Sequence, residues 1–351
     1  MKNDQQVLVI LLPGFPGIEE DSTCLPAQQA IIRQINSNFP FIKLIIFSFQ
    51  YPFNAIEYNW NNNKVIAFGG SNKGGIARLL LWRRVRQKFN AIKKAHPISG
   101  ILSFWCGECG LLGKQLGKKN NIRQFCWIMG QDARKENNYV KRINPDGREL
   151  IAISDFAREE FNRNHGIVPG HTIPIGIDRK EFDDEPVLRS IDLLAVGSLI
   201  PLKQYAIFLE VVASMKRRMP DIKAVLVGDG SEKRKLQTLI KDLGLENNIS
   251  LKGELPHSKV LGYMQRAKLF LHVSAYEGFG IVCLEALYAG ATVISFTKPM
   301  DRSIPNWYHA SGKEDMISMA FDLLNSSPSY KAELPYTIEE TVEQVMSLFS
   351  F

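Results

Sequence analysis

The chain has 351 residues, of which 45% are hydrophobic and 23% charged, a composition typical of soluble globular proteins. This length is enough for two domains, and no apolar run approaches the ~20 residues of a membrane-spanning helix. Five cysteines in so large a chain do not indicate a disulfide framework, so we expect a reducing cytoplasm. The apolar run at 7–15 follows only Lys2 and lacks a small-residue cleavage site, which indicates a buried strand rather than a signal peptide.

In the first half of the chain, strand patterns alternate with helical ones. Strands are predicted near residues 6–15, 41–49, 98–105, 123–129 and 149–155, and helices near 27–35, 74–95, 110–119 and 156–166. This alternation is typical of a doubly wound parallel sheet.

The pattern restarts after a stretch rich in Pro, Gly and charge at 173–186. Strands are predicted near 190–199, 223–230, 248–254, 269–275 and 291–296, with helices near 204–218, 231–244, 259–267, after 280 and at 337–349. We therefore predict an α/β protein with two Rossmann-like domains, 1–170 and 171–336, facing a central cleft. The C-terminal helix within 337–351 can pack back on the first domain.

Four blocks in the second half carry a family resemblance. They are "VGSLIPLKQ" (196–204), "VLVGDGSEKRKLQ" (225–237), "ISLKGELPHSKVLGYMQRA" (249–267) and "SAYEGFGIVCLEALYAGATVI" (274–294). In this order they resemble the donor domain of family 4 retaining glycosyltransferases, enzymes of GT-B fold that use a nucleotide diphosphate-sugar. The resemblance covers residues 150–295 well and the first 150 only in outline.

The stretch "EGFGIVCLEALYAG" (277–290) supports this resemblance physically. A helix that begins near Gly280 offers the backbone N–H groups of Phe279, Gly280 and Ile281 and a positive dipole end to a diphosphate. Helical side chains lean toward the N-terminus, so Glu285 can reach back to the ribose, whereas Glu277 precedes the helix and faces the sugar. The alternative is that Glu277 only stabilises the helix N-terminus and Glu285 is solvated or paired with a lysine.

The resemblance assigns further donor contacts. Lys203 is expected to stabilise the charge that grows on the departing β-phosphate, and Ser198 stands where the family often has an arginine. Gly228 either contacts the nucleotide or simply makes the turn after its strand. Leu255 stands where the family's base contacts the backbone.

Candidate acceptor-side residues lie in the first half. Gly14 and Gly17 follow the first strand, where the family has a glycine loop, although a simple turn is an equal alternative. Gln131 and Asp132 occupy the region where the family often has a histidine that touches the donor sugar. We expect either of them to hydrogen-bond a sugar hydroxyl.

Other reactive residues do not indicate a metal or a cofactor. Cys106 and Cys109 form a CxxC, but no second pair completes a four-ligand zinc site. The histidines do not stand at metal-ligand spacing, and His272, inside an apolar strand, is interpreted as a core histidine with satisfied hydrogen bonds. We therefore expect neither a metal nor a cofactor beyond the sugar donor.

The resemblance implies a retaining, metal-independent transferase that uses a UDP-sugar, with a GDP-sugar next. The acceptor is expected to be a glycan or a lipid-linked saccharide of cell-surface polysaccharide synthesis. Two alternatives stay open: a non-catalytic partner that binds nucleotide-sugar, and a GT-B nucleotide-sugar epimerase.

Charge is distributed unevenly along the chain. Residues 1–150 carry 21 Lys and Arg against 10 Asp and Glu, a net charge of +11, whereas the whole chain carries +7. Much of this excess lies in the predicted amphipathic helix at 77–96, which contains Trp82. Such a helix can attach a cytoplasmic protein to the anionic inner leaflet, or it can simply cover a sheet and solvate its basic face. No nucleic-acid recognition motif is present, so nucleic acid is not expected as a partner.

Overall fold

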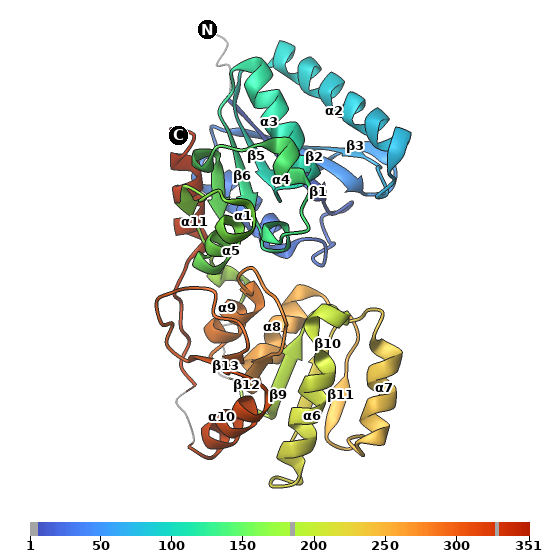
Figure 1. The fold of residues 1–351 in the computed structure, drawn as a ribbon, viewed down its shortest axis with the longest axis vertical. Helices are drawn as coiled ribbons and strands as arrows, with labels where there is room; N and C mark the ends of the chain where they lie inside the picture. Colours follow the sequence, from blue (N-terminus) through green and yellow to red (C-terminus); the bar gives the residue numbers. More distant parts are fainter. Residues whose placement is uncertain (1–5, 183–186, 327–329) are drawn as a thin grey trace. The chain divides into compact units, whose positions relative to one another are not determined.

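The computed structural model describes residues 6–182, 187–326 and 330–351. The chain divides into two compact units, one formed by Met1–Ile175 with Ile338–Phe351 and the other by Gly176–Thr337 (Figure 1). Each unit is a layered α/β domain with its own sheet and its own core, as the alternation of elements predicted. Residues 183–186 of the predicted junction lie outside the described residues.

The sheet of the first unit has the strand order β3-β4-β2-β1-β5-β6-β7-β8. Its strands are β1 (Val7–Gly14), β2 (Lys43–Tyr51), β3 (Ala55–Trp60), β4 (Asn63–Phe68), β5 (Ile98–Phe104), β6 (Gln124–Ile128), β7 (Leu150–Ala152) and β8 (His171–Thr172). All pairings are parallel except that of β3 with β4. β1 is buried over its first six residues, because helices cover both faces of a parallel sheet.

The hairpin of β3 and β4 was not predicted. Asn61 and Asn62 form its two-residue turn with φ of 44° and 62°, which is the left-handed conformation that asparagine tolerates. β3 is the edge strand and most of it is exposed, so it lacks the apolar run by which the buried strands were found.

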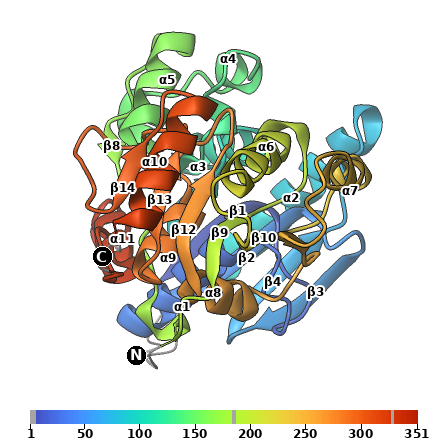
Figure 2. The ribbon, with the colours of Figure 1, turned by 90° about the horizontal axis from the view of Figure 1, so that it is seen from below.

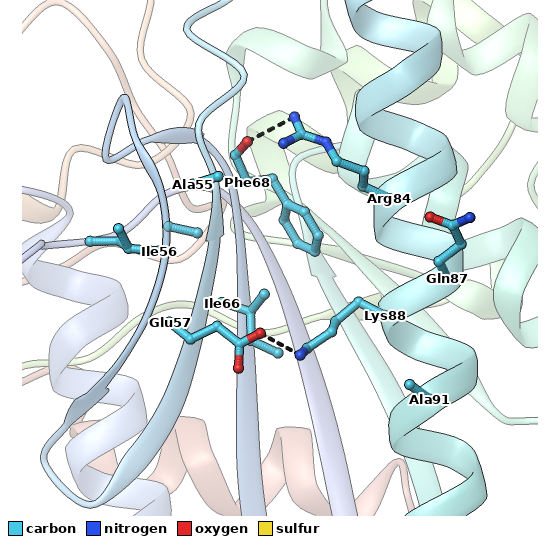
Figure 3. Close-up of a pocket in the computed structure, with 10 residues that line it drawn as sticks. Ala55, Ile56, Glu57, Ile66, Phe68, Arg84, Gln87, Lys88 and Ala91 are labelled. Carbon is cyan, nitrogen blue, oxygen red and sulfur yellow. Dashed lines mark hydrogen bonds and ion pairs between the residues drawn. The ribbon is translucent and has the colours of Figure 1, made fainter.

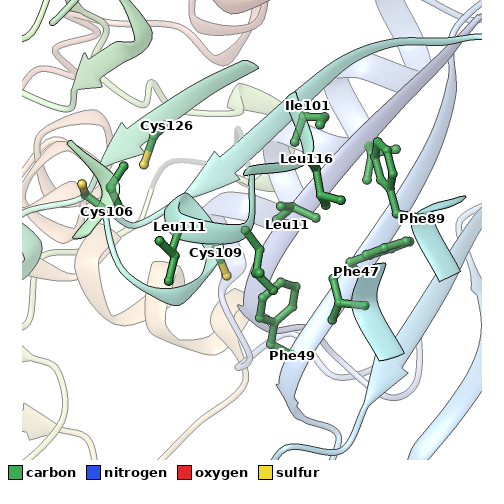
Figure 4. Close-up of a cluster of buried hydrophobic side chains, with 14 of the residues drawn as sticks. Leu11, Phe47, Phe49, Phe89, Ile101, Cys106, Cys109, Leu111, Leu116 and Cys126 are labelled. Atoms are coloured by element: carbon green, nitrogen blue, oxygen red, sulfur yellow. The ribbon is translucent and has the colours of Figure 1, made fainter. Parts of the chain in front are cut away.

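The helices of the first unit are α1 (Pro26–Asn38), α2 (Gly75–Ala95), α3 (Glu108–Asn120), α4 (Tyr139–Ile143), α5 (Asp155–His165) and α11 (Ile338–Ser347). One face of the sheet packs against α2 and α3 through a cluster that includes Leu11, Phe47, Phe89 and Leu116 (Figure 4). Cys106, Cys109 and Cys126 belong to this cluster, and all three are free thiols. Packing is therefore the visible role of the CxxC.

α11 returns from the end of the chain to the first unit, where it packs on α1 (Figure 1). Its apolar residues Ile338, Val342, Val345 and Met346 are buried, and the Thr341 hydroxyl donates to the carbonyl oxygen of Pro174 at 2.8 Å. Phe349, which follows the helix, meets Phe125 edge-on at 5.2 Å.

The second unit has a wholly parallel sheet of order β11-β10-β9-β12-β13-β14. Its strands are β9 (Ile191–Val196), β10 (Ala224–Val227), β11 (Ile249–Leu251), β12 (Ala267–His272), β13 (Thr292–Ser295) and β14 (Trp307–His309). Its helices are α6 (Tyr205–Lys216), α7 (Lys233–Asp242), α8 (His257–Gln265), α9 (Ile281–Tyr288) and α10 (Lys313–Asn325). α6 and α10 pack together on one face of the sheet, and α8 and α9 lie together on the other (Figure 2). β14 and α10 were not predicted.

Gly100 in β5 gives a direct test of how α11 is anchored. A Cβ at this position would lie 2.6 Å from Cε1 of Phe349, which is closer than real Cβ atoms approach a ring. We expect Gly100→Ala to lower the free energy of unfolding by about 1–3 kcal/mol, because the ring must leave its site or the strand must shift. The fall in melting temperature, measured by calorimetry, checks this.

Gly262→Ala is the matched control. Gly262 lies in α8 and a Cβ there would meet no atom within 4 Å, so alanine should be neutral or stabilising. Equal melting temperatures for the two variants would contradict the anchoring role of Phe349.

Candidate active site

The strand order of the second unit reverses between β9 and β12, which are neighbours in the sheet. Open parallel sheets bind ligands at the carboxyl ends of the strands that flank such a reversal. The segments that follow these two strands contain Lys203 and Glu277, so the predicted donor residues lie at this position.

The turn before α9 exposes the helix N-terminus. Gly280 is the N-cap residue with φ +83°, a left-handed conformation in which glycine avoids strain, and no described side chain caps the helix. Uncapped N–H groups and the dipole favour a phosphate at this end of a helix. Phe279 is 1% exposed and packs edge-on against Trp307 and Tyr336, so only its backbone is available to a ligand, while Ile281 is half-buried.

Lys203 and Glu277 form an ion pair and a hydrogen bond through Nζ and Oε2. Lys203 ends the 3₁₀ helix η4 (Pro201–Lys203), and the backbone N–H of Ala275 donates to the carbonyl oxygen of Leu202 at 3.0 Å. This backbone bond ties the two loops together and holds the charges in contact. The structure thus brings together the two residues that were predicted as catalytic.

His272 lies beneath this pair and was misinterpreted. It ends β12, is 4% exposed, and neither ring nitrogen has a hydrogen-bond partner among the described residues. Its Nε2 lies 3.5 Å from Oε2 of Glu277, the limit of a hydrogen bond. The interpretation as a satisfied core histidine is therefore wrong, because the imidazole faces the candidate catalytic carboxylate.

The charge state of Glu277 follows from these neighbours. Burial raises the pKa of its carboxyl, but the nearby His272 and the Lys203 ammonium outweigh burial and lower that pKa to about 2. Glu277 is therefore a carboxylate throughout the neutral range. It can balance positive charge on a ligand or accept a hydrogen bond from a hydroxyl, but it is too weak a base to abstract a proton.

Glu285 lies in the middle of α9 and pairs with a histidine that was not predicted. Nε2 of His257 is 2.8 Å from Oε1 of Glu285, and Nδ1 of His257 is 3.2 Å from Oε2 of Glu181. Glu181 ends the 3₁₀ helix η3 (Arg179–Glu181) at the start of the second unit. The expected alternative of a lysine partner for Glu285 is wrong. His257 stands inside the block 249–267 that resembles the family, but nothing in its spacing to Glu181 or Glu285 indicated a contact.

Three further predicted donor residues belong to the same unit. Ser198 is exposed in the loop after β9, and Leu255 is half-buried in the segment between β11 and α8. Gly228 has φ +140°, and a Cβ there would collide with the carbonyl oxygen of Gly197. The close approach of two backbones explains this glycine without a nucleotide contact.

The predicted acceptor-side residues belong to the first unit. A Cβ at Gly17 would come within 3.3 Å of Pro52, so this glycine lets the loop after β1 pack closely beside the end of β2. A Cβ at Gly14 would lie 3.4 Å from Tyr51, which is an ordinary contact distance. The Asp132 carboxylate is buried and accepts backbone N–H groups of Cys106 (2.6 Å), Met129 (2.9 Å) and Gly130 (2.8 Å).

Asp132 therefore holds its loop together, which corrects the expectation that it faces a sugar. Burial raises the pKa of Asp132 to about 6 in spite of these hydrogen bonds. Gln131 beside it is exposed and can reach a ligand. Among the described residues, no group of three or more His, Cys, Asp or Glu side chains could hold a metal ion.

A pocket of 420 Å³ lies in the first unit, between α2 and the β3–β4 hairpin (Figure 3). Its floor is apolar and includes Ile66 and Phe68, and its rim carries Arg84 and Lys88. Arg84 donates to the carbonyl oxygen of Phe68 at 3.0 Å, and Lys88 pairs with Glu57 across the pocket. All its lining residues belong to the first unit, whereas the Lys203–Glu277 pair belongs to the second.

Sequence comparison matches residues 178–305 to the family described as "Glycosyl transferases group 1". The chain is 26% identical over 203 residues to the gpi3 subunit of phosphatidylinositol N-acetylglucosaminyltransferase from Schizosaccharomyces pombe, covering 56% of this chain and 44% of that protein. It is 30% identical over 161 residues to 2-deoxystreptamine N-acetyl-D-glucosaminyltransferase from Niallia circulans, covering 46% and 39%. The chain thus spans less than half the length of these curated relatives.

Structural comparison covers nearly the whole chain. The structure of HepE from Anabaena in complex with UDP and glucose superposes with a TM-score of 0.67 at 17% identity, covering 98% of this chain and 97% of that one. This likeness concerns the fold. Residues 178–305 thus match the glycosyl transferases group 1 family, and the two α/β units that the chain forms have the GT-B fold.

Proposed function

We propose that the protein is a retaining, metal-independent glycosyltransferase that takes a sugar from a UDP-sugar. The observation that carries the proposal is the contact between Lys203 and Glu277 beside the uncapped N-terminus of α9, at the reversal of the strand order. All three features lie within the segment that matches the family. UDP-N-acetylglucosamine is the first donor to test, because both curated relatives are named as N-acetylglucosaminyltransferases.

In the proposed reaction, the α9 N-terminus and Lys203 bind the diphosphate. The bond between the anomeric carbon and the β-phosphate oxygen breaks, and the acceptor oxygen bonds to the same face of that carbon. The acceptor proton passes to a phosphate oxygen of the departing UDP. Glu277, a weak base, contacts sugar hydroxyls instead of taking this proton, and Lys203 stabilises the charge that develops on UDP.

The ion pair generates a test that separates its two members. Glu277→Ala should lower turnover of UDP-N-acetylglucosamine by at least ~100-fold but leave the Kd for UDP within ~3-fold of wild type, because it frees Lys203 for the diphosphate. Lys203→Ala should lower turnover ~10²–10³-fold and weaken UDP binding as well. UDP release and calorimetric titration with UDP measure the two effects.

Lys313→Ala and Glu210→Ala are the controls. These residues form an ion pair of similar kind elsewhere in the same unit, with Nζ and Oε2 2.8 Å apart. Both controls should behave as wild type. Equal loss of turnover and of UDP affinity in Glu277→Ala would assign Glu277 a purely structural role. Tight UDP binding by a wild-type protein that turns over no UDP-sugar would favour the non-catalytic alternative.

The absence of a metal requirement is a separate expectation. The α9 N-terminus and Lys203 supply positive charge to the diphosphate, so turnover should persist within ~2-fold in excess EDTA. Titration of EDTA into the UDP-release assay, followed by Mg²⁺ and Mn²⁺, measures this. Loss of turnover on chelation and its recovery with either ion would overturn the metal-independent mechanism.

We further propose that the acceptor is presented at an anionic membrane surface, to which α2 attaches the first unit. The helix buries Leu81, Trp82, Val85, Phe89 and Ile92 in the core. Trp82 is therefore not available to a membrane, which corrects the expectation from the sequence. A different face exposes Ile76 (77%), Leu79 (60%) and Leu80 (53%), followed by Arg83 and Lys94. Exposed apolar and basic side chains on one helix face are the two features by which interfacial helices bind anionic lipid. Within the described residues, no helix is long and apolar enough to cross a membrane.

This surface can be tested with matched charge reversals. Arg83→Glu with Lys94→Glu should abolish co-sedimentation with anionic vesicles at low salt, since each basic residue contributes roughly 1 kcal/mol. Leu79→Ser with Leu80→Ser should weaken it. Lys118→Glu with Lys119→Glu, at the exposed end of α3, makes the same change in net charge and should leave binding largely intact. Equal binding of wild type to anionic and neutral vesicles would leave α2 as a scaffold helix.

A further inference from the structure

His257 joins two carboxylates that come from separate elements of the second unit. It opens α8, while Glu181 ends η3 and Glu285 lies in the middle of α9. The three side chains are mostly buried, with exposed fractions of 16% for His257, 14% for Glu285 and 25% for Glu181. Each ring nitrogen of His257 faces a different carboxylate, so the imidazole is held from both sides.

This arrangement favours the imidazolium form. Both ring nitrogens donate a hydrogen only when the ring is protonated, and two carboxylates without it would repel each other. Burial lowers the pKa of His257, but the hydrogen bonds to Glu181 and Glu285 outweigh burial and raise that pKa to about 10. The ring therefore donates to both carboxylates at neutral pH.

The contact also determines which part of Glu285 is available. His257 occupies Oε1 at 2.8 Å, and no other hydrogen bond of Glu285 is found among the described residues. Oε2 is thus left to accept from a ligand. A carboxylate held at one oxygen cannot rotate freely, so the other oxygen keeps a fixed direction.

We propose that His257 is a positioning residue that fixes Glu285 for the two hydroxyls of a ribose, and thereby sets the preference for a ribonucleotide over a 2′-deoxyribonucleotide. The inference rests on the proposed function and on the prediction from the sequence that Glu285 binds the ribose of the nucleotide. Glu181 acts one step further away, because it holds the imidazole that holds Glu285. His257 itself contacts neither substrate nor reacting atoms in this assignment.

Two substitutions separate the two contacts of His257. The amide nitrogen of glutamine reaches about as far as Nε2, so His257→Gln keeps a donor toward Glu285. The amide nitrogen of asparagine reaches only as far as Nδ1, so His257→Asn keeps a donor toward Glu181 and loses the one toward Glu285. His309→Asn, in exposed β14, is the matched control for the same chemical change.

The experiment compares the Kd values for UDP and 2′-deoxy-UDP by calorimetry in each variant. We expect wild type and His309→Asn to bind UDP at least ~10-fold more tightly than 2′-deoxy-UDP. This difference corresponds to the loss of one hydrogen bond to a charged group. His257→Asn should reduce this preference below ~3-fold, because it should weaken the binding of UDP more than that of 2′-deoxy-UDP. His257→Gln should keep most of the wild-type preference. The melting temperature of each variant identifies any that has failed to fold, and His257→Gln then carries the test.

The outcomes distinguish this inference from the proposed function. Failure of wild type to bind UDP would overturn the proposed function and the inference with it. UDP binding without a preference over 2′-deoxy-UDP, or an unchanged preference in a folded His257→Asn, would overturn the role of His257 alone. An equal loss in the Gln and Asn variants would assign His257 to structure rather than to positioning.

Discussion

The candidate site depends on one constraint, the adjacency of β9 and β12 in a parallel sheet. The carboxyl ends of parallel strands lie at the same edge of the sheet, so the loops after β9 and β12 must meet there. The backbone bond from Ala275 to Leu202 joins these loops, and the Lys203–Glu277 pair forms across the junction. Gly280, three residues beyond Glu277, is the N-cap of α9, so the N-terminus of this helix comes to the same place. The strand order thus places a cation, a carboxylate and a helix dipole at one edge.

The sequence was sufficient for the features that this constraint governs. Continuous apolar strands and amphipathic helices identified most of both sheets, because burial on both faces leaves an unmistakable run such as 7–12. Lys203, Glu277 and Glu285 were predicted from the family resemblance, and the structure brings Lys203 and Glu277 into contact where β9 and β12 end. The edge hairpin β3–β4 was missed because its signal was the Asn61-Asn62 turn and an alternating pattern, not an apolar run.

What the sequence could not supply is the set of partners brought together by tertiary packing. His257 meets Glu181 and Glu285 although they are 76 and 28 positions away, and no periodicity encodes such contacts. His272 carried a weak signal, an ionisable residue at the carboxyl end of an apolar strand, but core histidines share that pattern. Asp132 and Trp82 show the reverse error. Asp132 was expected to contact a sugar but instead holds its loop together. Trp82 was expected to contact a membrane but instead lies in the core.

Each carboxylate of the site faces a cation within the protein, and the two pairs differ in what a nucleotide would do to them. Lys203 neutralises Glu277, so a diphosphate that binds Lys203 must compete with that carboxylate and turn it toward the sugar. His257 is shared by Glu285 and Glu181, so a ribose that binds the free oxygen of Glu285 disturbs neither ion pair. A ligand that must break an existing ion pair loses binding energy, whereas a ligand that binds a free oxygen of an intact pair does not. Under the proposed function, ribose recognition is thus preorganised, and diphosphate binding is coupled to the release of Glu277.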